Sequence, residues 1–242
     1  MQGYQEDLAY IHNAGFGDFA LKAAPGLLGI LRRCRIASGQ VVDLGCGSGI
    51  WARELMRSGY QVLGIDLSAS MIQLARRHAP GARFRTGSLL RVRLPRCRAV
   101  TSMGECVNYC FDRANSRAHL KRFFRRVYQA LDPGGAFVFD IVEPGQLPHG
   151  ASRRIYRQGT DWAVFSETTE DRRRNMLTRR ITAFRRHGKL YRRSEETHRL
   201  RLYRSSELAG DLSRTGFQVR IQHGYGRFRL SLGHAVIVAR KP

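Results

Sequence analysis

Residues 41–49 of this chain read Val41-Val42-Asp43-Leu44-Gly45-Cys46-Gly47-Ser48-Gly49. The apolar residues at the start predict a buried strand, and a helix is expected from about Ile50 to Arg57. Three glycines at alternate positions connect the two. Because glycine adopts a positive φ without steric cost, this loop lets another molecule approach the backbone closely. The free N–H groups at the start of the helix would point at that molecule, so the stretch predicts a ligand-binding loop.

The glycine spacing narrows the kind of ligand. A dinucleotide-binding loop has the pattern G-x-G-x-x-G, whereas here Ile50 stands where the last glycine would be. The chain has no G-x-x-x-x-G-K-S/T pattern, which marks a phosphate-binding P-loop. Asp43 comes two residues before the first glycine, where a carboxylate would repel a phosphate but suits a cationic amino group. A pyrophosphate ligand is therefore disfavoured.

A second acid follows at the distance expected for a ribose contact. Residues 60–65 predict another buried strand, and Asp66 comes directly after it, 17 residues beyond Gly49. In a β-α-β unit an acid at about this place accepts hydrogen bonds from ribose hydroxyls. The alternative is that Asp66 only begins a turn, with Ser68 as the N-cap of a helix over 69–78. We favour the ribose contact, and Ser68 can be a cap in either case.

Strands and helices alternate along most of the chain, which favours a doubly wound α/β fold with a mostly parallel, seven-stranded sheet. The segment 4–35 is expected to be helical, with a break or a helix start at Pro25-Gly26. The residues 131–135 are expected to form a turn that ends a helix. The predicted strands are 41–45, 61–66, 82–86, 98–102, 136–141, 217–222 and 234–240, and the later helices are 50–58, 69–78, 116–130 and 205–215.

The alternation stops at about Glu143 and resumes after Tyr203. Stretches near 161–170, 175–187 and 189–203 are rich in Thr, Tyr, Phe, Arg and Glu, and short turn-like segments separate them. This pattern predicts an antiparallel insert of three strands. The register of these strands decides which side chains face the rest of the protein, and the sequence leaves that register open.

The loop and the acids together resemble the class I S-adenosylmethionine (SAM) methyltransferases. Residues 41–49 match motif I of that family, and Gly64-Ile65-Asp66-Leu67-Ser68 matches its acidic second motif. Residues 131–135 and 215–217 match the turns before its fifth and sixth strands. The resemblance implies a Rossmann-like methyltransferase fold, SAM as cofactor, and a single domain over 1–242. Within it, 1–35 would form a helical lid, 36–142 and 204–242 the SAM-binding core, and 143–203 a substrate-covering insert.

The resemblance also implies which residues contact the cofactor. The glycine loop would line the methionine part of SAM, Asp66 would hold the ribose, and hydrophobic side chains would flank the adenine. Segments after the third and fourth strands would contact the adenine edge and the sulfonium. The implied cofactor residues are Asp43, Gly45, Cys46, Gly47, Gly49, Asp66, Leu67, Met71, Ser88, Leu89, Met103 and Gly104.

Candidates for the acceptor side come from the N-terminal segment, the loop after the fourth strand, and the insert. Methyl transfer from a sulfonium needs alignment of nucleophile, methyl and sulfur, and a base only where the nucleophile is protonated. His12 could instead be a surface histidine and Glu105 a helix-start carboxylate, while Tyr10 and Phe16 could be core residues. The candidate catalytic residues are Glu105, His12 and Tyr109. The candidate substrate residues are Tyr10, Phe16, Asn108, Trp162 and Glu195.

Composition leaves two substrate classes open. The net charge is +23, and 38 of the 42 basic residues are arginine. The arginines are scattered, which favours a solvated basic surface over a nucleic-acid site. The fourth-strand segment also departs from the N-P-P-Y-type motif of many nucleic-acid amino methyltransferases. We therefore expect methyl transfer to a nitrogen or oxygen atom of a small molecule, with RNA methylation as the alternative. A SAM-binding protein without catalysis is a third possibility.

Cysteine usage and hydropathy bear on location and metals. Five cysteines occur, at positions 34, 46, 97, 106 and 110, without a C-x-x-C pair or a nearby residue that would complete a zinc set. Reduced thiols in the cytoplasm are the simplest interpretation. The same cysteine pattern gives no reason to expect a metal. No run of 18 apolar residues occurs, so no membrane span is expected. The sequence leaves the oligomeric state open.

Overall fold

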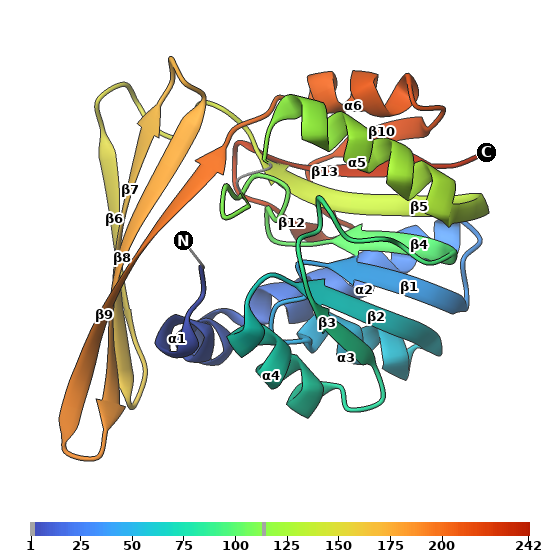
Figure 1. Ribbon diagram of the computed structural model, residues 1–242. Helices are drawn as coiled ribbons and strands as arrows, with labels where there is room; N and C mark the ends of the chain where they lie inside the picture. The colour runs from blue at the N-terminus through green and yellow to red at the C-terminus, as the bar shows by residue number, and fades with distance from the viewer. Residues whose placement is uncertain (1–2, 113–114) are drawn as a thin grey trace.

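A seven-stranded sheet forms the centre of the computed structural model, which describes residues 3–112 and 115–242. The strand order is β3-β2-β1-β4-β5-β13-β10, and only β13 runs against the others. This confirms the predicted doubly wound, mostly parallel sheet (Figure 1). The strands are β1 Gly39–Leu44, β2 Tyr60–Asp66, β3 Arg83–Thr86, β4 Cys97–Ser102, β5 Leu131–Val142, β10 Gln218–Gln222 and β13 His234–Arg240.

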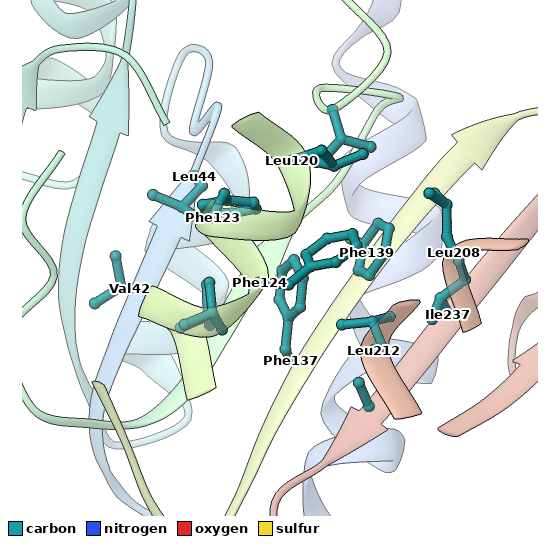
Figure 2. Packing of buried hydrophobic residues seen from close by; sticks show 14 of the residues in the cluster. Val42, Leu44, Leu120, Phe123, Phe124, Phe137, Phe139, Leu208, Leu212 and Ile237 are labelled. Atoms are coloured by element: carbon teal, nitrogen blue, oxygen red, sulfur yellow. The ribbon is translucent and has the colours of Figure 1, made fainter. Parts of the chain in front are cut away.

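Helices cover both faces of this sheet. One face packs against α2 (Asp18–Arg33), α3 (Ile50–Arg57) and α4 (Ala69–His78). The other packs against α5 (Arg117–Ala130) and α6 (Ser205–Ser213). The helix α5 buries one stripe because its apolar residues recur at helical spacing. Figure 2 shows the resulting core, which includes Phe123, Phe124, Phe137, Phe139, Leu208, Leu212 and Ile237.

Local signals set several element boundaries. The Ser68 side chain accepts a hydrogen bond from the Met71 N–H, so Ser68 is the predicted N-cap of α4. The helix α5 ends at Ala130, as expected, but β5 begins at Leu131 rather than after the predicted turn. The Pro133-Gly134-Gly135 segment is accommodated as an irregularity in the pairing of β4 with β5.

The insert contains four antiparallel strands, so the prediction of three was wrong. They are β6 Ser152–Gln158, β7 Trp162–Asp171, β8 Met176–His187 and β9 Leu190–Arg201, in the order β6-β7-β8-β9. Every residue of β6 is exposed, and three of its seven residues are arginine. An edge strand with no buried face has no alternation of apolar and polar residues, which is why its sequence gave no strand signal. A small hairpin, β11 Gly224–Tyr225 and β12 Phe228–Arg229, was also not predicted.

The N-terminal segment forms two helices, α1 (Glu6–Phe16) and α2, that meet at Gly17 with a bend of 61°. The break expected at Pro25-Gly26 was wrong, because Pro25 lies inside α2. Gly26 has a packing role instead: a Cβ atom there would lie 1.9 Å from the Tyr225 carbonyl oxygen of β11. Within the described residues no single helix is long and apolar enough to cross a membrane, and α1 and α2 satisfy that test only together, as a bent pair.

The two N-terminal helices pack on different parts of the molecule. The helix α2 belongs to the core under the main sheet. The helix α1 packs Leu8 and Ile11 against Trp162, Val164 and Ala183 of the insert. In Figure 1, α1 accordingly lies between the insert and the main sheet, near the strand ends where the glycine loop is found. The carboxyl ends of the parallel strands are thus faced by elements of this same chain.

Candidate active site

The three glycines of the loop after β1 all have positive φ values, 71°, 52° and 79°, but they meet different surroundings. A Cβ atom on Gly45 would lie 2.3 Å from the Cys106 sulfur, and one on Gly49 would lie 2.8 Å from Ala75 of α4. A Cβ atom on Gly47 would meet nothing within 4 Å. The outer glycines therefore permit close packing within the protein, while the middle one leaves its outward side free for a ligand.

Two carboxylates flank this loop, of which Asp43 is buried and Asp66 is partly exposed. Asp66 accepts hydrogen bonds from the Gly47 N–H (2.9 Å) and the Ser68 N–H (2.8 Å), and burial raises the pKa of Asp66. Asp43 accepts from the Thr101 hydroxyl at 2.9 Å, and burial raises the pKa of Asp43 to about 7. A pair of acids at adjacent strand ends suits a ligand with a positive charge and hydroxyl donors, and opposes a phosphate. The residues present therefore fit SAM.

The other predicted cofactor residues lie around the same strand ends. Met71 is buried in the first turn of α4, and Leu89 packs against the core. The Ser88 hydroxyl contacts the Asp112 carboxylate and accepts from the Leu90 N–H. Met103 packs against the core at the end of β4.

Glu105, in the loop after β4, has two partners from other strands. Its carboxylate is 2.9 Å from the Arg179 guanidinium of β8 and accepts from the His234 ring of β13 at 2.9 Å. Burial pushes the pKa of Glu105 upward, but Arg179 and His234 outweigh it and hold the pKa below its ordinary value. Burial lowers the pKa of His234, and Glu105 outweighs burial and raises it. Glu105 therefore joins the main sheet to the insert as a carboxylate.

Tyr109 continues this contact toward the N-terminus. Its hydroxyl accepts from Arg179 at 3.2 Å and lies 3.1 Å from the hydroxyl of Tyr4. The Tyr4 ring is surrounded by aromatic rings, including His198 at 4.8 Å and His12 at 5.1 Å between centroids. A hydrogen-bonded series thus runs from Tyr4 through Tyr109 and Arg179 to Glu105.

Residues 3–5, here called the N-terminal strap, bridge the insert and the core. The N–H groups of Tyr4 and Gln5 donate to the Glu196 carboxylate of β9, at 2.7 and 2.8 Å. The Tyr4 carbonyl accepts from the Ser68 hydroxyl at 2.7 Å. His198 lies 2.8 Å from Glu196 on the other side. The strap therefore crosses from the inner face of the insert to the residue that follows the proposed cofactor acid by two positions.

The candidate catalytic residue His12 has a ring nitrogen without a hydrogen-bond partner among the described residues. Its Nδ1 atom is buried and makes no hydrogen bond. Burial, followed by the effect of His198, lowers the pKa of His12 to about 4. The imidazole is therefore neutral at pH 7, and a neutral ring has a nitrogen that can accept a proton or a hydrogen bond.

Comparisons with known proteins agree with this geometry. A family model described as a methyltransferase domain matches residues 41–135, which include the glycine loop, Asp66 and the end of β4. The chain belongs to the class I SAM-dependent methyltransferases. SAM is the methyl donor of this methyltransferase. No group of three or more His, Cys, Asp or Glu side chains that could hold a metal occurs in residues 3–112 and 115–242.

Individual relatives cover different shares of the methyltransferase. A dTDP-3-amino-3,6-dideoxy-α-D-glucopyranose N,N-dimethyltransferase from Streptomyces fradiae is 31% identical over 151 residues, which are 62% of this chain and 56% of that protein. This chain thus spans little more than half of that relative. A SAM-dependent methyltransferase structure from Clostridium acetobutylicum has a TM-score of 0.80 at 19% identity, covering 96% and 97% of the two chains. A SAM-bound amino pentose methyltransferase from Micromonospora echinaspora has a TM-score of 0.78 at 19% identity, covering all of both.

Three of the predicted substrate residues make contacts within the protein. The Asn108 side chain hydrogen-bonds the backbone of Val142 and Arg201, which ties the insert to β5. Trp162 is buried against α1. The Tyr10 hydroxyl donates to Asp161 at 2.7 Å, on the side of α1 that meets the β6–β7 turn.

The other two predicted substrate residues lie apart from each other. Phe16 stacks on His12 at 5.9 Å between ring centroids, so it borders the aromatic group around Tyr4. Glu195 points to the outer face of the insert, where its carboxylate pairs with Arg193. That outer face carries a cavity of about 530 Å³ lined in part by Tyr156, Phe165 and Glu195. The structure therefore does not place Glu195 with Glu105.

Several residues of the site gave little signal in the sequence. Arg179, Glu196, His198 and His234 come from strands far along the chain, and none lies in a motif. Asp140 is the one residue of this group with a signal in the sequence. An acid within the apolar run of β5 is unusual, because a buried aspartate normally has hydrogen-bond or charged partners.

Proposed function

We propose that this methyltransferase transfers the methyl group of SAM to a nitrogen or oxygen atom of a small molecule. The observation that carries the proposal is the closure of the site by the chain itself. The N-terminal strap is hydrogen-bonded to Glu196 on one side and to Ser68 on the other. An acceptor confined between the core, α1 and the insert must be small. The name of the Streptomyces fradiae relative, an amino-sugar N,N-dimethyltransferase, agrees with this size class.

The cofactor would be held by the loop and the acids beside it. We assign the ribose hydroxyls to Asp66, the amino group to Asp43, and the methionine part to Gly45, Cys46, Gly47 and Gly49. Leu67, Met71, Ser88 and Leu89 would surround the adenine, and Met103 and Gly104 would pass near the sulfonium. When bound, SAM supplies a methyl group on a leaving group that is already activated, so the protein mainly aligns the reactants.

The acceptor side would use the groups around Tyr4. Arg179 fixes Glu105 and Tyr109 in a single arrangement, which would orient the polar groups of an acceptor. His12 is neutral and has an unpaired nitrogen, so it is the best placed group to accept the proton that a nucleophile loses. Glu105 is held as a carboxylate by Arg179 and by its hydrogen bond with His234, which makes it better suited to orientation than to proton removal.

The test combines cofactor binding with an acceptor screen. Calorimetry should show that the pure protein binds SAM and S-adenosylhomocysteine. Release of S-adenosylhomocysteine should then be followed with a panel of amines and hydroxyl compounds that includes nucleotide-linked amino sugars, and mass spectrometry should locate the new methyl group. A folded protein that binds neither form of the cofactor would contradict the proposal.

RNA methylation is the second candidate, and the basic surface is the observation that favours it. The net charge is +23, and the exposed strand β6 adds Arg153, Arg154 and Arg157 at one sheet edge. An RNA substrate bound through phosphates would show an affinity that falls steeply with salt. Methyl incorporation into RNA that follows this salt dependence would favour the candidate, whereas incorporation only into small acceptors would remove it. A cytoplasmic location remains a prediction from the cysteine pattern.

A further inference from the structure

The turn after β4 has an unusual backbone. Gly104 and Glu105 both have positive φ values, 88° and 62°. Glycine adopts this conformation freely, whereas a residue with a Cβ atom is disfavoured there by roughly 1–2 kcal/mol. Such a conformation persists where neighbouring groups hold it in place.

Asp140 on the adjacent strand β5 is the group that holds this turn. Its Oδ1 atom accepts a hydrogen bond from the Gly104 N–H at 2.7 Å and from the Glu105 N–H at 3.3 Å. The side chain is only 1% exposed and lies between the buried residues Phe139 and Ile141 in the sequence. A charged acceptor strengthens both bonds, so the ionised form of Asp140 fixes the turn more firmly than the neutral form.

The backbone of this turn sets the direction of the Glu105 side chain. With this backbone, the Glu105 carboxylate reaches Arg179 of β8 and His234 of β13, each at 2.9 Å. Three segments distant in the sequence therefore meet on one carboxylate, next to the segment Met103-Gly104 assigned to the sulfonium. A change in the turn would displace Glu105 and release Arg179 from the acceptor side.

We propose that Asp140 is a positioning residue for methyl transfer, which holds the Gly104–Glu105 turn so that Glu105 meets Arg179 and His234. Its effect on turnover rests on the proposed function, whereas its hold on the turn does not. The groups that face Asp140 are Glu105, His234, Cys106 of the β4 loop and Tyr225 of β11.

Because of these surroundings, the strength with which Asp140 fixes the Gly104–Glu105 turn depends on pH. Burial, followed by the negative charge of Glu105, raises the pKa of Asp140 to about 7, while its two backbone hydrogen bonds and His234 oppose the rise. Above that pH the carboxylate is ionised and accepts both N–H groups. Below it the carboxyl group takes up a proton, and the turn is held less firmly.

Hydrogen exchange of the turn tests the hold without any acceptor. Amide protection of Gly104 and Glu105, corrected for the intrinsic exchange rate, should fall by about tenfold between one pH unit above and one below the Asp140 pKa. In Asp140→Asn the protection should be low at both pH values. The matched control is Asp211→Asn, which changes another buried aspartate on α6, where the carboxylate accepts from Arg117 and its pKa is lowered. Protection that is independent of pH in the wild type and unchanged in Asp140→Asn would overturn the proposal.

Turnover provides the second arm. With saturating SAM, kcat should rise with pH through about 7 in the wild type and in Asp211→Asn, and should be low and flat in Asp140→Asn, with the SAM dissociation constant unchanged. Asp43 also has a pKa raised to about 7, but protonation of Asp43 should weaken SAM binding rather than lower kcat at saturating SAM. A wild-type pH profile in Asp140→Asn would refute the positioning role. Normal exchange results without turnover on any acceptor would refute the proposed function and leave the hold on the turn established.

Discussion

Asp66 connects the glycine loop to the helix that follows β2, because its two oxygens accept from the Gly47 and Ser68 N–H groups. Replacement by alanine removes both bonds and the proposed ribose contact. Hydrogen bonds to a charged group contribute roughly 1.5–3 kcal/mol, so the affinity for S-adenosylhomocysteine should fall by about tenfold or more. Calorimetry checks this, with Asp132→Ala as control, because Asp132 pairs with Arg96 at the surface. Equal affinities of Asp66→Ala and the wild type would contradict the assignment.

Glu195 and Glu196 are sequence neighbours with opposite surroundings, which makes them a matched pair for testing the strap. Glu196 accepts from the N–H groups of Tyr4 and Gln5, while Glu195 pairs with Arg193 on the outer face. In Glu196→Gln only one oxygen remains as an acceptor, so the strap should open more often. Chymotrypsin cleavage after Tyr4 or Tyr10 should be faster by about tenfold, since cleavage follows the population of open forms. Glu195→Gln should be cleaved at the wild-type rate, and equal rates for both variants would show that Glu196 does not hold the N-terminal strap.

The site could be predicted from the sequence only where function and local structure share a position. Asp43 and Asp66 stand at the ends of apolar strands, on either side of the glycine loop, so strand periodicity and glycine spacing together indicated them. Arg179 and His234 reach Glu105 from 74 and 129 positions away, and no local pattern records that meeting. The face of Glu195 depends on strand register, which one residue of slip would reverse.

The helix α1 is joined to the insert by ion pairs as well as by apolar packing. Asp7 is only 5% exposed and lies 2.5 Å from Arg192 and 3.4 Å from Arg185. Asp7→Asn should lower the free energy of unfolding at pH 7 by about 2 kcal/mol, between the values for exposed and buried pairs because Arg192 is half-exposed. Urea unfolding measures this. Asp18→Asn, which alters an exposed carboxylate beside Lys22, should change little.

The same pair predicts the pH range of the effect. Burial alone would raise the pKa of Asp7, but hydrogen bonds and charges from Arg192 and Arg185 outweigh it and lower the pKa. A carboxylate with a lowered folded-state pKa stabilises fully above its unfolded pKa of about 3.9, and the stabilisation is lost as pH falls through the folded value. The difference between wild type and Asp7→Asn should therefore persist to about pH 5 and shrink below about pH 4. A difference that grows on acidification would contradict the ion-pair explanation.

Elements with a buried face were predictable, and those without one were not. The seven sheet strands and the helix 69–78 show apolar periodicity, and the structure contains them all. The strand β6 is fully exposed and carries no such pattern. The bend between α1 and α2 lies at Gly17 rather than at Pro25, because Pro25 is accommodated within α2 while Gly26 permits contact with β11. A Pro-Gly pair normally indicates a break or a turn, but here tertiary packing keeps both residues within a helix.

The molecule as a whole carries far more positive than negative charge. The excess of 42 basic over 19 acidic residues gives a net charge of +23. Many acidic side chains already have arginine partners, such as Asp7, Glu105 and Glu167, so the excess arginines repel one another across the surface. Net repulsion of this kind destabilises the compact state.

Salt should therefore stabilise this protein. Screening acts over a Debye length of about 30 Å at 0.01 M salt and about 8 Å at 0.15 M, so added salt removes the long-range repulsion first. Short, partly buried pairs such as Arg179–Glu105 are screened less. We expect Tm to rise by about 2–4 °C between 0.01 and 0.15 M sodium chloride, which corresponds to about 1 kcal/mol for a chain of this size. Thermal unfolding by circular dichroism measures the shift, and sodium perchlorate at equal ionic strength controls for specific effects of the anion. A fall in Tm would show that local ion pairs, rather than the net charge, dominate the electrostatic contribution to stability.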